Sequence, residues 1–181
     1  MIITNRNNTF EKNKTMLVQS LLSEFLHEAE NTRKLLNAIP DSALDWKPSE
    51  KNWTTGQLAS HIAECYNWFP ATLHQDVFDM GTYKYDKGDI THAANIVAKF
   101  EENLLIAKQA LETATDDSMM TIWTMEAGGK PIFPPMPRIQ VVRSFLFNHL
   151  YHHRGEMVVY LRATGNRVPG LYGPTADDQN F

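Results

Sequence analysis

The stretch of residues 148–157, NHLYHHRGEM, places three of the chain's seven histidines within five positions. Successive residues of an α-helix turn by about 100°, so His153 lies about 40° from His149 on a helical wheel. Leu146 falls about 60° from His149, on the same apolar stripe, whereas His152 lies about 60° away on the other side. The spacing therefore predicts a core-facing helix whose inward stripe carries His149 and His153, with His152 at the margin.

His149 and His153 are four residues apart, which brings both imidazole rings over one point of the helix surface. Two-histidine metal motifs on helices use this spacing. The alternative is a pair of buried histidines, each satisfied by a hydrogen-bond partner. The spacing alone leaves these two interpretations open.

A third metal ligand would have to come from another helix, and His61 is the best candidate. Within residues 54–69, His61 shares a helix face with Leu58, Cys65 and Trp68, so it also points inward. The remaining histidines lie away from apolar stripes or near breaks in the helical pattern, and we expect them at the surface: His27, His74 and His92.

Cys65 follows His61 by four residues, so the two side chains could both bind a metal ion. Together with His149 and His153 they would form a closed, four-ligand structural site. We favour the alternative, in which Cys65 is a small buried core residue. Three histidines would then leave an open position for chemistry.

The spacing of apolar residues predicts a single all-α domain, a four-helix bundle that spans residues 1–181. In the third helix we place seven residues toward the core: Ala94, Val97, Ala98, Leu104, Leu105, Ala107 and Leu111. We expect residues 115–137, with four prolines and two adjacent glycines, to form a long loop before the last helix, with a short strand at most. Gly165 should end the last helix before an irregular C-terminal tail, and residues 1–13 should form a loose arm. The helices are predicted over residues 15–38, 54–69 (with a break at Pro70 and a continuation over 71–78), 91–114 and 138–164.

Composition excludes several classes of function. The chain has 181 residues, of which 43% are apolar, and a net charge of −4. Nucleic-acid and membrane-surface binders need a basic patch, so we expect neither kind of partner. The single cysteine cannot form an internal disulfide, and the N-terminus lacks the apolar segment of a signal peptide. A cytoplasmic location is the simplest expectation.

Two blocks of the sequence resemble the DinB-like family, which includes the YfiT-type metalloenzymes. The first, residues 38–64, is similar to the family's P…L.W.P…WT…L..H pattern. The second, residues 147–178, is similar to its H…HHRGQ…YLR…G..VP..YGP.AD ending. This second block is long and specific, and the resemblance covers most of the chain.

The resemblance implies an up-down-down-up four-helix bundle that holds one divalent metal ion through three histidines. Matched position by position, these are His61, His149 and His153. Zinc is the expected metal; nickel, iron and manganese also fit, because three imidazoles discriminate weakly among them. The resemblance further implies a homodimer and a small-molecule substrate, with a low-molecular-weight thiol as one candidate for the thiol-transferase members.

Glu156 stands where the family has glutamine after the HRG motif. It lies about 20° from His149 on the wheel, so it could accept a hydrogen bond from a ligand or act as a general base; a surface glutamate paired with a cation is the alternative. We expect substrate specificity from Trp53, Trp68, Trp123 and the 115–137 loop. The leading hypothesis is a metal-dependent transferase or hydrolase, and the rival is a helical protein in which the metal or the histidine cluster is only structural.

Overall fold

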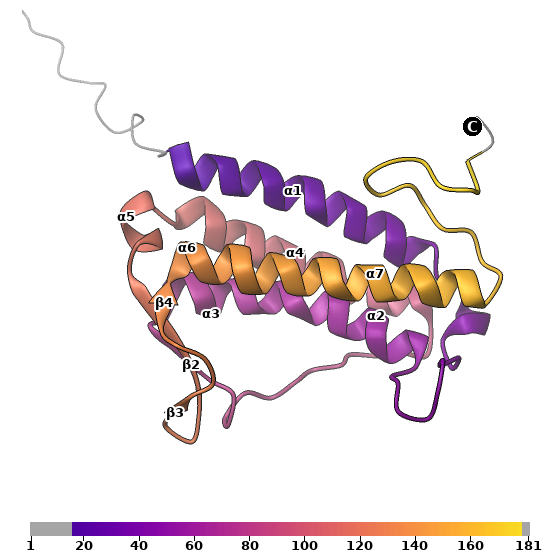
Figure 1. The fold of residues 1–181 in the computed structure, drawn as a ribbon, viewed down its shortest axis with the longest axis horizontal. Coiled ribbons are helices and arrows are strands. Elements are labelled where there is room, and N and C mark those ends of the chain that lie inside the picture. Colours follow the sequence, from indigo (N-terminus) through magenta and orange to yellow (C-terminus); the bar gives the residue numbers. More distant parts are fainter. Residues whose placement is uncertain (1–15, 179–181) are drawn as a thin grey trace, which may run out of the picture.

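Four long helical segments, arranged side by side, build the molecule in a computed structural model that describes residues 16–178 (Figure 1). The predicted arm, residues 1–13, lies outside the described residues. The prediction of four helical segments is confirmed. Their bounds are α1 Met16–Asn37, α2 Thr55–Glu64 followed by α3 Trp68–His74, α4 Ala93–Thr113, and α6 Arg138–Val141 continued through a π-helical segment Val142–Phe147 into α7 Asn148–Ala163.

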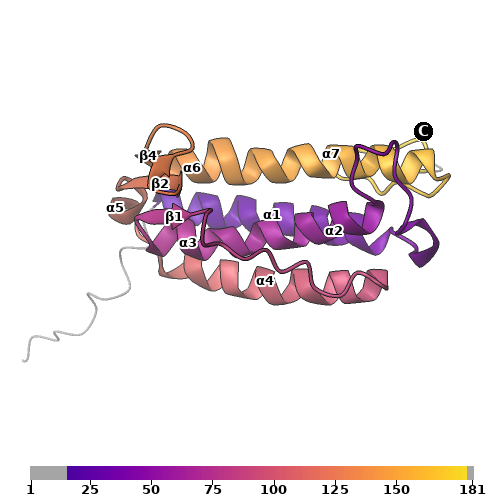
Figure 2. The ribbon, with the colours of Figure 1, turned by 90° about the horizontal axis from the view of Figure 1, so that it is seen from below.

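The topology is up-down-down-up, as expected. Segments α2–α3 and α4 run in the same direction, opposite to α1 and α6–α7 (Figures 1 and 2). Two successive parallel helices need a long connection, and residues 80–92 supply it by returning along the bundle to the start of α4. The connection passes close to α2, and this position matters for the candidate site.

Local sequence determines where α2 begins and why it does not continue. Thr54 caps its N-terminus in a capping box: the Thr54 hydroxyl accepts from the Gln57 N–H at 3.2 Å, and the Gln57 side chain accepts from the Thr54 N–H at 2.9 Å. A tight 3₁₀ turn at Cys65–Asn67 then separates α2 from α3. Pro70 explains this turn, because proline lacks an N–H and crowds the preceding turn of helix.

The expected continuation of this helix over residues 71–78 is only partly correct. Helix α3 ends at His74, and Val77–Asp79 form strand β1 instead. Strand β1 pairs in parallel with β2, Ile122–Ala127, so that Val77 lies opposite Thr124. Tertiary pairing has therefore overridden the local helical pattern.

A small sheet covers one end of the bundle, where the sequence was expected to form little beyond a loop. Besides β1, strand β2 pairs antiparallel with β3 Lys130–Pro131 and with β4 Met136–Pro137. Gly128 and Gly129 form the turn between β2 and β3 with φ values of +58° and +74°, which glycine adopts without strain. The same region also contains a short helix, α5 Asp116–Met119.

The buried face of α4 agrees with the expected one only in part. Leu104, Ala107 and Leu111 are buried as expected. Ile96 and Phe100 point into the core, whereas Ala94 and Ala98 are exposed and Leu105 is 56% exposed. The large side chains of α4 bury far more apolar area than alanine does, so they determine which face turns inward.

The last helix ends as the sequence predicted, and the tail after it packs against the bundle. Gly165 has φ +73°, and the Asn166 N–H donates to the Leu161 carbonyl at 2.9 Å across the helix end. Asp177 accepts from the Val168 N–H at 2.8 Å and pairs with Arg162, so the tail turns back along the helix.

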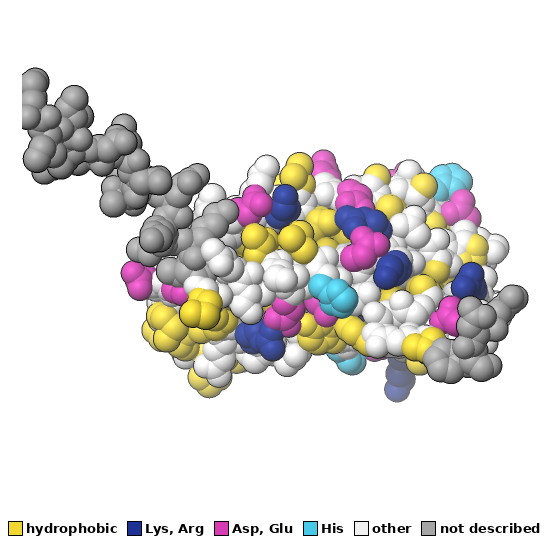
Figure 3. Space-filling view, turned by 90° about the horizontal axis from the view of Figure 1, so that it is seen from above, with side chains coloured by type: hydrophobic (Ala, Val, Ile, Leu, Met, Phe, Trp, Pro, Cys, Tyr) yellow, Lys and Arg dark blue, Asp and Glu magenta, His cyan; other side chains and the backbone are white. Residues whose placement is uncertain are grey.

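On the outer face around α1, charged side chains of both signs are mixed with hydrophobic and other side chains (Figure 3). Among residues 16–178, no helix combines the length and apolarity needed to cross a bilayer.

Candidate metal centre

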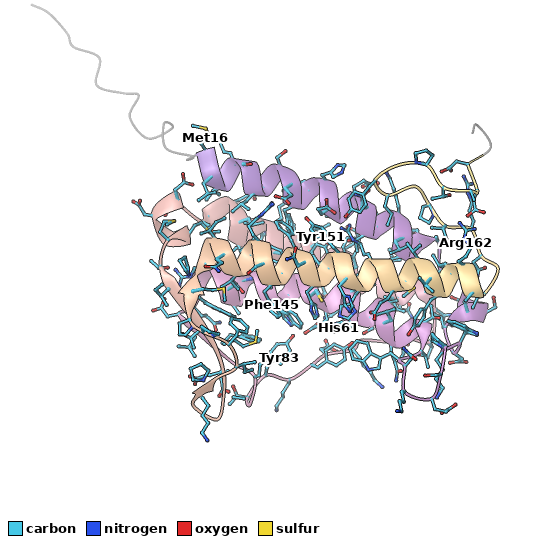
Figure 4. All side chains as sticks on the ribbon, viewed as in Figure 1. Met16, His61, Tyr83, Phe145, Tyr151 and Arg162 are labelled. Atoms are coloured by element: carbon cyan, nitrogen blue, oxygen red, sulfur yellow. The ribbon has the colours of Figure 1, made fainter. Side chains whose placement is uncertain are left out.

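The imidazole rings of His61, His149 and His153 converge between α2 and α7. His61 Nε2 lies 2.9 Å from His149 Nε2, and His149 Nε2 lies 3.1 Å from His153 Nε2. One ligand atom from each of the three residues lies within 4.8 Å of the other two. The structure therefore brings together the three histidines that the sequence selected. His61 lies on the side of α7 that faces Tyr83 of the 80–92 connection (Figure 4).

Burial keeps these imidazoles neutral. It is the main cause that lowers the pKa of His61 to about 3 and that of His149 to about 4, and the neighbouring histidines add to the effect. Burial also lowers the pKa of His153, although Glu156 opposes it. A neutral imidazole has one nitrogen with a free lone pair, which is the form that binds metal ions.

Glu156 fixes the orientation of His153. Its Oε2 atom lies 2.7 Å from His153 Nδ1, and Oε1 lies 3.5 Å from Nε2 of the exposed His152. Because a carboxylate only accepts hydrogen bonds, the proton of neutral His153 is on Nδ1 and the lone pair is on Nε2. Glu156 thus occupies the position of an acceptor for a ligand N–H, and its role as a general base stays a prediction.

The three nitrogens cannot satisfy one another by hydrogen bonds alone. If His149 Nε2 is protonated, it can donate one hydrogen bond, either to His61 or to His153. The other of these two short contacts then has no hydrogen bond. If it is unprotonated, its lone pair faces the lone pair of His153 Nε2. A cation between the rings resolves this conflict, because each nitrogen can direct its lone pair at the ion. Two nitrogen atoms bound to one tetrahedral zinc ion would be separated by about 3.3 Å. The observed spacings of 2.9 and 3.1 Å are close to that value, so the three residues fit a divalent metal ion.

A cavity of about 600 Å³ opens over the histidines. Trp53 and Trp68 contribute to its wall, as expected, but Trp123 and residues 115–137 do not. Trp123 is instead buried at the sheet end of the bundle. The remaining wall comes largely from the 80–92 connection. The residues lining the cavity are Trp53, Gln57, His61, Trp68, Met80, Tyr83, Tyr85, Lys87, Ile90, His149 and His153.

Cys65 is buried beside the centre but outside the three-histidine cluster. Its Sγ atom lies 3.8 Å from His61 Nε2, and burial raises the pKa of the thiol. A raised pKa opposes the thiolate form that binds metals. This environment agrees with the interpretation of Cys65 as a core residue, so the centre keeps an open side toward the cavity.

The other histidines lie apart from the cluster, as the sequence indicated. His27, His74 and His92 are all exposed. His92 pairs with Asp41 at 2.8 Å, and His74 lies 3.3 Å from the Thr113 hydroxyl. None of the three belongs to a group of ligand-type side chains among residues 16–178 that could hold a metal ion.

Arg154, in the HRG motif, points away from the centre into a second polar cluster. Its guanidinium is buried and pairs with Glu28 of α1, and it also donates to the Tyr172 hydroxyl in the tail. The Arg154 Nη1 atom donates to the Glu28 carbonyl at 2.8 Å. Arg154 therefore connects α7 to both α1 and the tail. Tyr151, next to it in this cluster, lies on the side of α7 toward α1 (Figure 4).

Comparison with known proteins places the fold and its motifs in one family. Residues 8–180 match the model of the DinB family. The chain is 31% identical to the uncharacterized protein YrdA of Bacillus subtilis over 160 residues, which cover 87% of this chain and 89% of YrdA. A DinB-like crystal structure from Bacillus cereus has 27% identity and a TM-score of 0.65, with 85% of this chain and 97% of the other covered. YfiT from Bacillus subtilis, described as a probable metal-dependent hydrolase with an unusual four-helix bundle topology, has 17% identity and a TM-score of 0.58 over 90% of this chain and 94% of its own. The chain therefore belongs to the DinB family.

Proposed function

We propose that the protein is a metal-dependent enzyme that activates a small nucleophile, a low-molecular-weight thiol or water, for attack on an electrophilic substrate. The observation that carries the proposal is the convergence of three neutral imidazoles at the floor of a cavity. The description of YfiT as a probable metal-dependent hydrolase supports the metal-dependent part of the proposal.

His61, His149 and His153 would hold the metal through their Nε2 atoms, with zinc as the first candidate. When bound, a divalent ion with three protein ligands supplies Lewis acidity at an open position, where it lowers the pKa of a water or a thiol. Glu156 holds the proton of His153 on Nδ1 and so keeps Nε2 available. The ring of Trp53 packs edge-on against His61, with centroids 4.9 Å apart.

The wall of the cavity favours a nucleophile that the metal ionises without further help. Among residues 16–178, none of the side chains that line the cavity is a carboxylate. Glu156 bonds the far nitrogen of His153, and the Glu64 side chain is buried and does not line the cavity. A reaction that needs a dedicated carboxylate base is therefore disfavoured. A thiol, whose ordinary pKa is near 8.5, needs the smallest shift, and this favours thiol transfer over hydrolysis.

Metal content tests the centre directly. Tag-free protein, purified without chelators and analysed by elemental analysis, is expected to carry about one metal ion per chain. The His61→Ala, His149→Ala, His153→Ala triple variant is expected to carry almost none, and His152→Ala serves as the matched control because its ring is exposed at the margin. Equal metal content in wild type and triple variant would refute the proposed centre.

Product analysis distinguishes the two nucleophiles. The metal-loaded protein is incubated with an electrophile that can react with thiol or water, with and without cysteine or glutathione as the probe thiols. Mass spectrometry of the products is expected to show metal-dependent formation of the thiol adduct. Formation of the hydrolysis product alone, at a rate that added thiol does not change, would assign the site to hydrolysis.

The rival interpretation, a structural metal staple, predicts a different result. A staple would lower the melting temperature sharply on metal removal and leave no metal-dependent turnover. A catalytic centre in a bundle with its own apolar core should lose turnover on chelation while it retains most of its thermal stability. Thermal denaturation with and without chelator, together with the product assay, separates the two readings.

A further inference from the structure

Aromatic rings surround the three histidines on the cavity side. The ring centroids of Trp53 and Trp68 lie 4.9 and 5.6 Å from that of His61. Tyr85 lies 6.3 Å from the same ring, and Tyr83 stands on the same side of α7 as His61 (Figure 4). Flat side chains from three separate segments of the chain therefore form one wall beside the candidate metal position.

The polar ends of Trp68, Tyr83 and Tyr85 are engaged within the wall. The Ser60 hydroxyl donates to the Lys87 carbonyl at 2.6 Å, so it must accept from the Tyr85 hydroxyl at 2.8 Å. The Trp68 indole N–H donates to the Tyr83 hydroxyl at 3.3 Å. The wall therefore offers a ligand mainly the carbon surfaces of its rings.

Large apolar side chains are also exposed around this cavity. Trp53 is 48% exposed, Tyr85 49% and Met80 38%, and all three line it. Single exposed apolar residues are normal at a protein surface, but several gathered around one hollow mark a ligand site. The volume of about 600 Å³ lies within the usual range for small-molecule pockets.

The charge around the cavity limits the ligand further. Within the described part of the chain, Lys87 is the one permanently charged side chain in the lining. Aromatic cages that bind quaternary ammonium ions depend on attraction between a cation and the ring faces. Here Lys87, and a divalent ion at the histidines, would repel a cation. An uncharged or anionic ligand fits this field.

We propose that the electrophilic substrate is an uncharged or anionic small molecule with a flat, apolar ring system. The ring packs against Trp53, Trp68 and Tyr85, and one polar group on it points to His61 and His149. The inference rests on the proposed function, because that polar group is the one that the metal would bind. It adds the substrate class, which the three histidines alone do not specify.

Two hydroxamates with the same metal-binding group test this substrate class. Acetohydroxamate and 2-naphthohydroxamate are titrated into the zinc-loaded protein by isothermal titration calorimetry. Burial of the naphthyl rings is expected to make the affinity for 2-naphthohydroxamate at least tenfold higher than that for acetohydroxamate. In the Trp53→Ala variant, the affinity for the naphthyl compound should fall at least fivefold and that for acetohydroxamate less than twofold. Trp53→Phe should recover most of the lost affinity for the naphthyl compound.

Two results would overturn the inference while the metal centre stands. The first is equal affinity, within twofold, for the two hydroxamates. The second is a Trp53→Ala variant that weakens both compounds alike, since the ring would then act through the metal site and not through the substrate.

A separate measurement keeps failure of the metal centre distinct. If elemental analysis finds no divalent metal, the proposed function fails, and 2-naphthalenesulfonate and methanesulfonate are titrated into the metal-free protein instead. Binding of the naphthyl compound alone would support the apolar ring site, and no binding of either would overturn it. Tighter binding of 2-naphthyltrimethylammonium than of 2-naphthalenesulfonate would overturn the assignment of ligand charge.

Discussion

His153 Nδ1 and Glu156 Oε2 are 2.7 Å apart, and this hydrogen bond orients the ring so that Nε2 faces His149. We expect Glu156→Ala to weaken metal affinity by roughly 10- to 100-fold, as loss of such supporting bonds does in other metal sites. Glu156→Gln should weaken metal affinity less, because the amide oxygen can still accept the hydrogen bond from His153 Nδ1. Competition with a chromophoric chelator measures the affinity. His152→Ala is the control, and equal affinity in wild type and Glu156→Ala would show that the bond has no role in metal binding.

The lowered pKa values of the histidines predict loss of stability in acid for the metal-free protein. The folded-state pKa values, about 3 for His61 and about 4 for His149, lie below the ordinary 6.5, so below pH 6.5 the unfolded chain binds more protons. The free energy of unfolding is therefore highest above about pH 6.5 and declines as the pH falls toward 4. The decline is at most about 1.4 kcal/mol per pH unit for each histidine. Urea denaturation at several pH values measures this free energy. A triple variant of the histidines to glutamine should show a flatter pH profile, and an equally steep one would refute this cause.

Glu64 should make the protein less stable as the pH rises, the opposite of the effect of the histidines. Its carboxyl group is buried, its oxygens find no hydrogen-bond partner within residues 16–178, and burial raises its pKa to about 7. Because the folded-state pKa lies above the ordinary 4.5, the unfolded chain releases the proton first, and stability falls as the pH rises from about 4.5 to 7. Glu64→Gln should therefore stabilise the protein at pH 8 by ~2 kcal/mol and change little at pH 4.5. Urea denaturation at the two pH values tests this, and an equal effect at both would contradict it.

The buried pair of Arg154 and Glu28 should be costly to break from one side. Both side chains are nearly inaccessible, so Arg154→Ala leaves an uncompensated buried carboxylate and should destabilise the protein by about 3–5 kcal/mol. Adding Glu28→Gln to that variant should recover part of the loss. The surface pair of Arg143 and Glu24 is the control, and Arg143→Ala should cost less than about 1 kcal/mol. Denaturant titration compares the four proteins; a similar loss for Arg154→Ala and Arg143→Ala would show that burial does not govern the cost.

The sequence predicted the bundle and the convergence of the histidines because both follow from local periodicity. The wheel positions of His149 and His153 depend only on helical geometry, and the face of His61 is set by large neighbours such as Leu58 and Trp68. The same reasoning was only partly correct on α4. Leu104, Ala107 and Leu111 are buried as predicted, whereas Ala94, Ala98 and Leu105 are exposed.

The wall of the cavity could not be predicted in this way. Tyr83 and Tyr85 come from a connection without periodicity, and their positions depend on contacts with Trp68 and Ser60 that are distant along the chain. Trp123 was assigned to the cavity on residue type alone, and it packs instead at the sheet end. An aromatic residue in a loop shows no sequence signal for which side of the bundle it will reach.

The π-helical segment Val142–Phe147 has a consequence for how this chain tolerates changes of length. It accommodates more residues per turn than the α-helices that it joins. Removing one residue there would close the widened turn to ordinary α-helix, so His149 and His153 would still face His61. The β2–β3 hairpin can gain or lose residues at its tip without moving a histidine. The chain should therefore tolerate the loss of one residue in this segment as well as changes of length at the hairpin tip.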